Sequence, residues 1–394
     1  MASVGGVGVG VPRGLRVGRR GGEGRKGGGP LLLASGGPTP RAARASPSRW
    51  ASKTVVRATE MREYLDLLCD GRDLTKTEAD EALQLLLDGA DPIQAGAFLC
   101  LMRAKGETPA EIAGMAGAMR RNSVACDCGP GVVDIVGTGG DGANTVNIST
   151  GSTALAAACG ARVAKHGNRS VSSQCGSADV LEELGVNIDL SPEGVAQCVN
   201  EVGVGFMFAP RYHPAMKAVV PVRKALRVRT AFNILGPMLN PAAAQYGLIG
   251  VYSPDLMMLM AESLQLLGVE RALVVHSEGI DELTPMATAL ALEVTPGGVR
   301  EVDVNPQTLG IDRCELKDLV GGTRDVNARM LRDALGGEVG AVGDALALNA
   351  GVALGVAGVA ASYKEGVAMA KEMQRSGKAL QTLDAWAKLS SSLS

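Results

Sequence analysis

The feature that most constrains the fold is a series of short apolar runs, rich in β-branched residues, that alternate with helical stretches. The runs are VVDIV, ARVAK, NIDL, VGFMFA, YGLIGVY and RALVVH, and they begin at residues 132, 161, 187, 204, 246 and 271. Short buried strands that alternate with helices are typical of a parallel sheet covered by helices. We therefore predict an α/β fold with a central, mainly parallel sheet, preceded by a small all-α domain.

The small domain is predicted from helix-start signals over residues 61–122. Thr77, Asp91 and Thr108 are expected to cap three helices, because a short side-chain oxygen can accept a hydrogen bond from a first-turn amide. Thr108 and Glu111 have the spacing of a capping box. No apolar β-type run interrupts this stretch.

These patterns predict three parts of the chain. Residues 1–57 form a disordered leader, 58–128 the N-terminal helical domain, and 129–394 the α/β domain. Part of the helical segment 210–235 is expected to pack on the helical domain. Residues 325–386 read as mainly helical and are expected to pack against the sheet.

The leader has the composition of an organellar transit peptide. Residues 1–57 carry eleven Arg or Lys and one acid, Glu23, whereas the remainder has 28 basic and 40 acidic residues, a net charge of about −12. The apolar run Leu31 to Leu33 is too short for a secretory signal, and the alternative is a plain glycine-rich tail. An acidic remainder with 3% aromatic residues argues against nucleic-acid binding.

The eight cysteines show no paired zinc spacing, and we interpret them as reduced thiols. Cys126-Asp-Cys128 could be redox-active, but the composition favours an incidental pair in a loop. No apolar stretch is long enough to predict a membrane span.

The first segment that carries chemistry is GTGGD, residues 137–141, which follows the predicted strand VVDIV. Its glycines let backbone amides approach an anion, and a helix expected to begin near Ser149 favours negative charge at its start. Thr145, Asn147, Ser149 and Thr150 add hydroxyl and amide donors for phosphate and sugar oxygens. The alternatives are a plain tight turn and helix capping.

A second polar segment, residues 165–173, is predicted to be a loop at the end of the strand ARVAK, where ligands sit in open α/β sheets. Lys165 would supply a positive charge for phosphate, and Asn168 hydrogen bonds for an aromatic acid or amine. His166 either lines the site or is structural.

Two further groups follow later in the chain. Asp281 and Glu282 come after the strand RALVVH; adjacent carboxylates are usually solvated, but with pyrophosphate nearby they would bind a divalent metal. In the basic helix HPAMKAVVPVRKALRVRT, Arg223 is our candidate for binding a substrate carboxylate with its guanidinium fork.

Four ordered motifs then resemble a known family. The motifs GTGGDG..TVNIST, KHGNRSVSSQCGSADVLEELG, YHPAMK..VPVRKALRVRTAFNILGPMLNP and GIDEL are similar to those of anthranilate phosphoribosyltransferase, from about Glu60 to the C-terminus. The resemblance implies a nucleoside phosphorylase/phosphoribosyltransferase-like fold. It also implies transfer of the 5-phosphoribosyl group from phosphoribosyl pyrophosphate to the amine of anthranilate, in tryptophan biosynthesis. Mg²⁺, a homodimer formed through the helical domains and, for this chain, targeting to the chloroplast or plastid stroma are further implications.

The resemblance also implies roles for individual residues. The phosphoribosyl pyrophosphate positions are Gly137, Gly140, Asp141, Thr145, Asn147, Ile148, Ser149, Thr150, Lys165 and Ser177. The magnesium positions are Ser149, Asp281 and Glu282, and the anthranilate positions are Gly137, Asn168 and Arg223, with His166 beside them. Cys175 and Met238 depart from the family pattern without touching a role.

Two other functions compete with this prediction. A pyrimidine nucleoside phosphorylase has a similar domain plan, but its phosphate loop differs from KHGNRSVSS. A non-catalytic relative that binds nucleic acid would need clustered positive charge, which the acidic remainder opposes.

Overall fold

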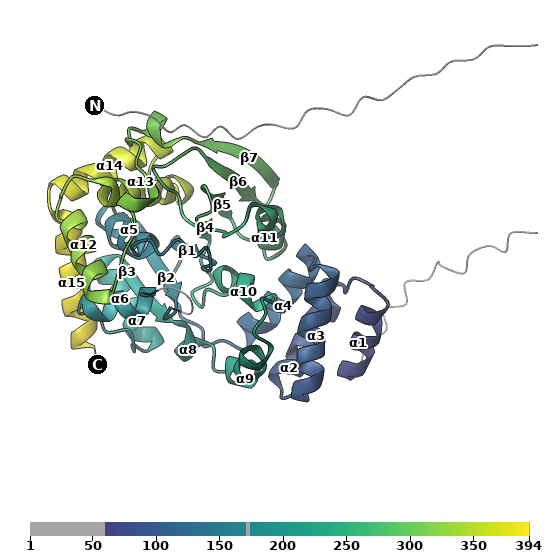
Figure 1. Ribbon diagram of the computed structural model, residues 1–394. Helices are drawn as coiled ribbons and strands as arrows, with labels where there is room; N and C mark the ends of the chain where they lie inside the picture. The colour runs from purple at the N-terminus through teal and green to yellow at the C-terminus, as the bar shows by residue number, and fades with distance from the viewer. Residues whose placement is uncertain (1–59, 171–173, 394) are drawn as a thin grey trace, which may run out of the picture. The chain divides into compact units, whose positions relative to one another are not determined.

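The computed structural model describes residues 60–170 and 174–393 (Figure 1). The predicted leader, residues 1–57, lies outside the described residues, and so do Val171 to Ser173 of the predicted polar loop. Among the described residues, no helix is long and apolar enough to cross a membrane.

Four helices form the N-terminal bundle, as predicted: α1 (Met61–Cys69), α2 (Lys76–Leu87), α3 (Pro92–Lys105) and α4 (Pro109–Arg121). Asp91 and Thr108 cap α3 and α4, and Thr108 forms the predicted capping box with Glu111. The cap predicted at Thr77 is wrong, because Thr75 caps α2.

The reason for this difference lies in the two overlapping patterns Thr75-x-x-Glu78 and Thr77-x-x-Asp80. The Thr75 hydroxyl accepts from the Glu78 amide at 3.2 Å, and the Glu78 carboxylate accepts from the Thr75 amide at 2.8 Å. Asp80 is instead held by the guanidinium of Arg121 on α4 at 2.5 Å. The longer Glu side chain can therefore complete a capping box that Asp80 does not.

The rest of the described chain is built around a seven-stranded sheet. Its strand order is β3-β2-β1-β4-β5-β6-β7. The first five strands in this order run parallel, and β6 and β7 add an antiparallel hairpin, so the sheet is mainly parallel as predicted. The strands are β1 (Val132–Gly137), β2 (Arg162–Gly167), β3 (Val204–Phe208), β4 (Tyr246–Gly250), β5 (Arg271–His276), β6 (Ala289–Thr295) and β7 (Gly298–Val304).

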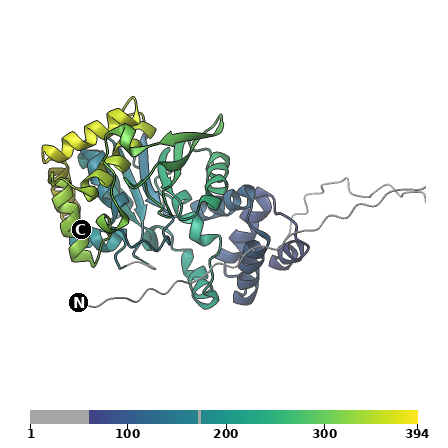
Figure 2. The same ribbon diagram turned by 45° about the horizontal axis from the view of Figure 1, so that its top comes forward.

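Helices pack on both faces of the sheet (Figure 2). The remaining helices are α5 (Ile148–Ala158), α6 (Ser177–Glu183), α7 (Pro192–Val202), α8 (Ala209–Tyr212), α9 (Met216–Leu226), α10 (Phe232–Leu235), α11 (Met257–Leu266), α12 (Arg324–Leu335), α13 (Ala341–Val356), α14 (Tyr363–Arg375) and α15 (Lys378–Ser392). As expected, the C-terminal stretch is mainly helical, and α13 contacts α5 and three strands.

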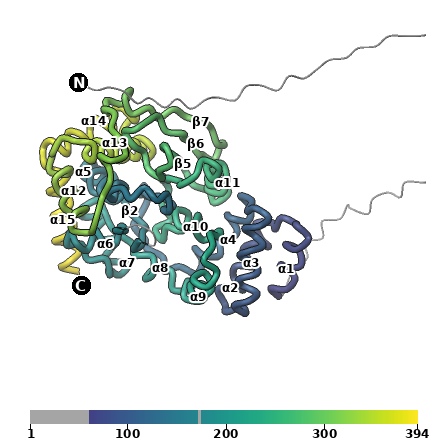
Figure 3. The backbone as a smooth tube through the Cα atoms, viewed as in Figure 1, coloured from purple at the N-terminus to yellow at the C-terminus, as the bar shows by residue number. Residues whose placement is uncertain are grey.

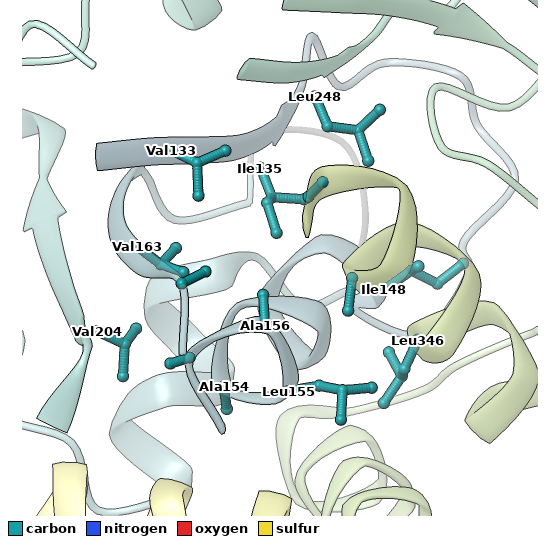
Figure 4. Close-up of a cluster of buried hydrophobic side chains, with 14 of the residues drawn as sticks. Val133, Ile135, Ile148, Ala154, Leu155, Ala156, Val163, Val204, Leu248 and Leu346 are labelled. Carbon is teal, nitrogen blue, oxygen red and sulfur yellow. The ribbon is translucent and has the colours of Figure 1, made fainter. Parts of the chain in front are cut away.

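Alternate residues of β4 and β5 enter two separate cores, because successive side chains of a strand point to opposite faces. The first core includes Leu248 of β4 and Leu273 of β5, together with α5 and α13. Figure 4 shows Leu155 of α5 and Leu346 of α13 close together in this core. The second core includes their neighbours Ile249 and Val274.

The second core also extends into the bundle. It joins buried residues of α1–α4 to α9, α10, α11 and the far face of the sheet. α9 contacts α2 and α3, and α10 contacts α4, in agreement with Figure 3. Part of the segment 210–235 therefore packs on the bundle.

The structure differs from the predicted strands in two places: one predicted strand is absent among the described residues, and two strands were not predicted. NIDL, residues 187–190, has no strand pairing, although Ile188 and Leu190 are buried in the first core. The segment lies between α6 and α7 and buries its apolar side chains by packing alone. The hairpin of β6 and β7 was not predicted, because polar residues such as Glu293, Arg300 and Asp303 obscure its apolar pattern.

Candidate functional site

The predicted phosphate loop meets the Asp281 loop at the carboxyl ends of neighbouring strands. β1, β4 and β5 lie side by side, and Asp281, which follows β5, reaches across to the loop that follows β1. The Asp281 carboxylate accepts hydrogen bonds from the Gly139 amide and, at 3.5 Å, from the Thr138 hydroxyl. The structure therefore brings together two segments that are more than a hundred residues apart in the chain.

Two glycines make this approach possible. A Cβ atom on Gly250 of β4 would lie 1.6 Å from the Asp281 carbonyl oxygen, and one on Gly137 would lie 2.4 Å from the Asp281 carboxylate. Both distances are far below van der Waals contact. Any other residue at either position would push the Asp281 loop away from the phosphate loop.

Three carboxylates share this place. The Asp281 amide donates to the Asp141 carboxylate at 3.5 Å, and Glu282 follows in the chain. Burial, and then the charges of Glu282 and Asp141, raise the pKa of Asp281 well above its usual range. Burial raises the pKa of Glu282 to about 7, although the Lys165 charge opposes this shift. These buried carboxyl groups thus resist ionisation by themselves, and a bound cation would stabilise their charged forms.

The donor set fits Mg²⁺. Among residues 60–170 and 174–393, no three His, Cys, Asp or Glu side chains are grouped so that they could hold a metal ion by themselves. Mg²⁺, however, is commonly held by one or two carboxylates together with phosphate oxygens and water. Asp281 and Glu282 can supply the carboxylates, and Ser149 bonds to Glu282 through its amide at 3.2 Å and through its hydroxyl.

The start of α5 presents the predicted polar residues. Ile148 and Ser149 lie in its first turn, and Asn147 precedes it without capping it through its side chain. Asn147 instead donates to the Cys175 carbonyl at 3.0 Å. The Thr150 hydroxyl donates to that of Ser177 at 3.0 Å, so the start of α5 is tied to the start of α6. Thr145 forms an isolated β-bridge with Val320.

Lys165 and His166 lie inside β2 and not in a loop, so their predicted placement is wrong. The strand runs to Gly167, and Lys165 is 1% exposed. Its Nζ donates to the Ile135 carbonyl at 2.6 Å, and burial lowers its pKa against the opposing charges of Asp134, Glu282 and Asp281. Charged residues at the end of an apolar run look like loop residues in a sequence, but these two continue the ladder to β3.

Two of the three buried histidines, His166 and His213, pack against each other. The rings of His166 and His213 meet edge to face with their centroids 5.0 Å apart. Burial lowers the pKa of His166 to about 3 and that of His213 to about 4, so both are neutral near pH 7. His213 was not singled out from the sequence, although it is one of only three histidines in the chain.

The other two predicted anthranilate residues lie apart from the carboxylates. Among the described residues, no hydrogen bond or ion pair joins Asn168 or Arg223 to Asp281 or Glu282. Asn168 is exposed and accepts from the Arg169 amide at 2.7 Å. The Arg223 guanidinium lies 5.2 Å from the centre of the Phe232 ring, and burial lowers its pKa.

A buried polar network beneath the site was missed from the sequence. Asp134, in the middle of β1, accepts from the His166 amide at 3.3 Å and from the Asn240 side chain at 2.7 Å. Burial raises its pKa to about 6. A carboxylate within the apolar run VVDIV is a signal that could have identified Asp134; nothing local identifies Asn240.

Arg229 was missed as well. Its guanidinium donates to the Gly140 carbonyl at 2.6 Å and lies 4.0 Å from the centre of the Tyr252 ring. It therefore braces the phosphate loop from the segment between α9 and α10. In the sequence it is one of several basic residues of a helical pattern, and nothing distinguishes it from them.

Comparisons with known proteins agree with this arrangement. Residues 62–123 match the helical bundle domain of a glycosyl transferase family, and residues 129–380 match the α/β domain of that family. An anthranilate phosphoribosyltransferase of Chlamydia felis is 45% identical over 334 residues, which cover 84% of this chain and 97% of the relative. One of Rubrobacter xylanophilus is 47% identical over 333 residues, with the same coverage.

Solved structures give the same result. The anthranilate phosphoribosyltransferase of Thermus thermophilus superposes with a TM-score of 0.79 at 43% identity, over 83% of this chain and 99% of that one. The enzyme of Saccharomyces cerevisiae in complex with phosphoribosyl pyrophosphate and Mg superposes with a TM-score of 0.78 at 26% identity, over 84% and 98%. Because relatives of this similarity span nearly the whole described part, the chain belongs to the anthranilate phosphoribosyltransferase family.

Proposed function

We propose that this chain transfers the 5-phosphoribosyl group from phosphoribosyl pyrophosphate to the amine of anthranilate, releasing pyrophosphate, in the pathway to tryptophan. The observation that carries the proposal is the contact between the Asp281 carboxylate and the glycine-rich loop after β1. It places an anion cradle and a carboxylate pair at one edge of the sheet, which is what a magnesium pyrophosphate leaving group requires.

Phosphoribosyl pyrophosphate, the substrate that gives up the phosphoribosyl group, would lie along the phosphate loop and the start of α5. The amides of Gly137 and Gly140, with the polar side chains of Thr145, Asn147, Thr150 and Ser177, can donate to phosphate and ribose oxygens. Ile148 contributes the first amide of α5. Asp141 has an oxygen that can accept from a ribose or water hydroxyl. Lys165, buried below them, offsets part of the negative charge of the carboxylates.

Mg²⁺ would be held by Asp281, Glu282 and Ser149, and when bound it neutralises negative charge on the pyrophosphate. The protein's own backbone holds the two carboxylates in place. The Gly139 amide fixes Asp281, and the Ser149 amide fixes Glu282. Asp281 and Glu282 thus form a preorganised anionic binding site for the metal.

The acceptor would be held by Arg223, Asn168 and the backbone at Gly137, with His166 beside them. Within residues 60–170 and 174–393 no carboxylate pairs with the Arg223 guanidinium, so it suits the carboxylate of anthranilate. His166 is neutral near pH 7, so it adds no charge that would oppose this binding.

The reaction itself needs positioning and electrostatics more than acid–base catalysis. As the bond to pyrophosphate breaks, the ribose C1 gains oxocarbenium character, and the uncharged aromatic amine attacks from the opposite face. The amine is already a nucleophile, so no strong general base is required. The residues of this site therefore act by holding the two substrates in line and by stabilising the departing charge.

The direct test follows the fluorescence of anthranilate with the purified chain, phosphoribosyl pyrophosphate and Mg²⁺. We expect the fluorescence to fall in step with the release of pyrophosphate, and the reaction to stop when Mg²⁺ is chelated. A parallel assay for phosphate-dependent cleavage of thymidine covers the nucleoside phosphorylase alternative. Thymidine cleavage without loss of anthranilate would overturn the proposal.

The division into parts at 57 and 128 and the plastid location belong to this proposal. The basic, acid-poor composition of residues 1–57 supports a transit peptide. Import of the full chain into isolated chloroplasts, followed by N-terminal sequencing of the product, tests it. A full-length product that stays outside would contradict a stromal location.

A homodimer formed through the bundle is a further part of the proposal. Large apolar side chains are exposed at Ile93 of α3 and Val220 of α9, two helices in contact with each other. Sedimentation equilibrium of the wild type and of Ile93→Glu checks it. We expect a dimer that the charge weakens, and a monomeric wild type at micromolar concentration would exclude it.

A further inference from the structure

Two thiols face each other in the segment that joins α4 to β1. Cys126 and Cys128 are each 2% exposed, and their sulfur atoms are 3.6 Å apart. They precede β1, whereas the phosphate loop follows it, so the length of β1 separates the two thiols from that loop, and the proposed transfer reaction does not use them. The pair is therefore unexplained by the function proposed above.

The backbone holds the two thiols in this arrangement. The Cys128 amide donates to the Cys126 carbonyl at 3.1 Å, which is the hydrogen bond of a γ-turn. The Asp127 carboxylate accepts from the Gly129 amide at 3.0 Å and fixes the residue between them. Such a turn keeps the two Cα atoms within reach of a disulfide, and closure requires the sulfurs to approach by about 1.5 Å.

The surroundings give the two thiols different reactivity. The contact with the Cys126 thiol lowers the pKa of the Cys128 thiol below its usual value, and the charge of Arg162 adds to this shift against the effect of burial. The Arg162 guanidinium also donates to the Cys128 carbonyl. The hydrogen bond with Cys128 and burial raise the pKa of Cys126. Because the Arg162 guanidinium contacts the backbone of Cys128, we assign Cys128 as the thiol that ionises first and Cys126 as the one that keeps its proton.

We propose that Cys126 and Cys128 are a redox modification site, a dithiol that hydrogen peroxide converts into an intramolecular disulfide. The Cys128 thiolate attacks one peroxide oxygen, the O–O bond breaks, and the departing hydroxide takes a proton to give water and a Cys128 sulfenic acid. The Cys126 sulfur then attacks the Cys128 sulfur, the S–O bond breaks, and the hydroxide leaves with the Cys126 proton as a second water. Two thiols are oxidised and one peroxide is reduced.

Peroxide suits this site because it is little larger than water, whereas two residues that are each 2% exposed exclude bulky disulfides. The Cys126 sulfur is already in contact with that of Cys128, so it can react with the Cys128 sulfenic acid as soon as this forms. The other cysteines provide internal comparisons, since Cys69 and Cys100 are exposed and the sulfur of Cys198 is buried without a second thiol in contact among the described residues.

The experiment uses the full chain with Cys159→Ser, because the tryptic peptide 122–162 then contains only Cys126 and Cys128 as thiols. The protein is treated with hydrogen peroxide, quenched, unfolded and alkylated with iodoacetamide before digestion. We expect this peptide to lose the mass of two hydrogen atoms and all alkylation, and dithiothreitol to restore both. If Cys126 and Cys128 remain alkylated while Cys69 and Cys100 are oxidised, the proposal is wrong.

Two single variants in the same background test the order of events. Cys126→Ser cannot close the disulfide, so dimedone should trap a sulfenic acid on Cys128. Cys128→Ser should give no such adduct on Cys126, and Cys69→Ser should leave the disulfide unchanged. An adduct on Cys126 instead of Cys128 would overturn the assigned roles. None of these readouts depends on transferase activity, so they stand apart from the test of the proposed function.

Discussion

The carboxylates of Asp281 and Glu282 are the residues on which the proposed metal site depends. Asp281→Asn combined with Glu282→Gln should lower turnover about 100-fold or more and abolish its Mg²⁺ dependence, since a bound metal contributes several kcal/mol to transition-state stabilisation. Initial rates over a range of Mg²⁺ concentrations measure the effect. Asp303→Asn, on an exposed position of β7, is the matched control. Unchanged turnover with unchanged Mg²⁺ dependence would remove both carboxylates from metal binding.

Arg223 is the residue that the acceptor site depends on. Arg223→Ala should raise the KM for anthranilate about 10- to 100-fold with a small effect on the KM for phosphoribosyl pyrophosphate, because a hydrogen bond to a charged group is worth about 1.5–3 kcal/mol. Lys224→Ala, the exposed neighbour on α9, should leave both values unchanged. An unaltered KM for anthranilate in Arg223→Ala would place the acceptor elsewhere.

Asp134, buried beneath the site, makes the free energy of unfolding depend on pH. Burial raises its pKa to about 6, so the folded chain binds this proton more tightly than the unfolded chain does. The resulting stabilisation is complete below about pH 4 and is lost as the pH rises through about 6. The unfolding free energy of the wild type minus that of Asp134→Asn should therefore fall by on the order of 2–3 kcal/mol between pH 4 and 7.

Urea unfolding of both proteins across this range measures the difference. Subtraction removes the titration of the other carboxyl groups, which the two proteins share. A difference that grows with pH would mean that the charged form of Asp134 is favoured by its bonds to Asn240 and His166 over its burial.

At the scale of the elements, the sequence predicted the helices and strands that local signals define. Asp91, and Thr108 with Glu111, mark the starts of helices that the structure contains. The predictions failed where contacts between distant segments determine the local structure. Segment 187–190 packs on the core without pairing as a strand, and Thr75 caps α2 in place of Thr77. β2 continues beyond the predicted run to Gly167 because the neighbouring strand β3 satisfies its backbone, which no local pattern reveals.

The site could be predicted in its parts but not in its assembly. The glycine-rich loop and the Asp281–Glu282 pair are visible as motifs. That Asp281 reaches Gly139 depends on the strand order, which the sequence pattern does not give. Asn240 bonds to Asp134 across 106 positions, and such a partner cannot be inferred from spacing.

Gly250 is the residue at the end of β4 that lets the two loops meet. Gly250→Ala should place a Cβ into the Asp281 backbone, displace that loop and lower both activity and stability, with overpacking worth about 1–3 kcal/mol. Gly96→Ala on α3 is the matched control, since its Cβ would make ordinary contacts of 3.7–3.8 Å. Turnover and thermal unfolding of both variants measure the effect. A Gly250→Ala enzyme with wild-type turnover would mean that this close approach is not needed.

At the scale of the whole molecule, the two cores divide the chain differently from the predicted domains. The first core belongs to one face of the sheet with α5 and α13. The second core joins the other face to the bundle, so Leu83 of α2 and Ile112 of α4 belong to the same apolar cluster as Val274 of β5. A bundle as short as residues 61–121 is marginal as an independent fold, and here part of its core is completed by the sheet.

The bundle and the sheet should therefore unfold together. Ile112→Ala, at a fully buried position of α4, should cost about 2–5 kcal/mol and lower the midpoint of one calorimetric transition by several degrees, without splitting it. Arg62→Ala on the exposed face of α1 should shift nothing. The chain beginning at residue 58 should give the same transition as the full chain. A separate, earlier transition in Ile112→Ala, with the second transition unmoved, would mean that the bundle is an independent folding unit and that its contacts with the sheet add little to stability.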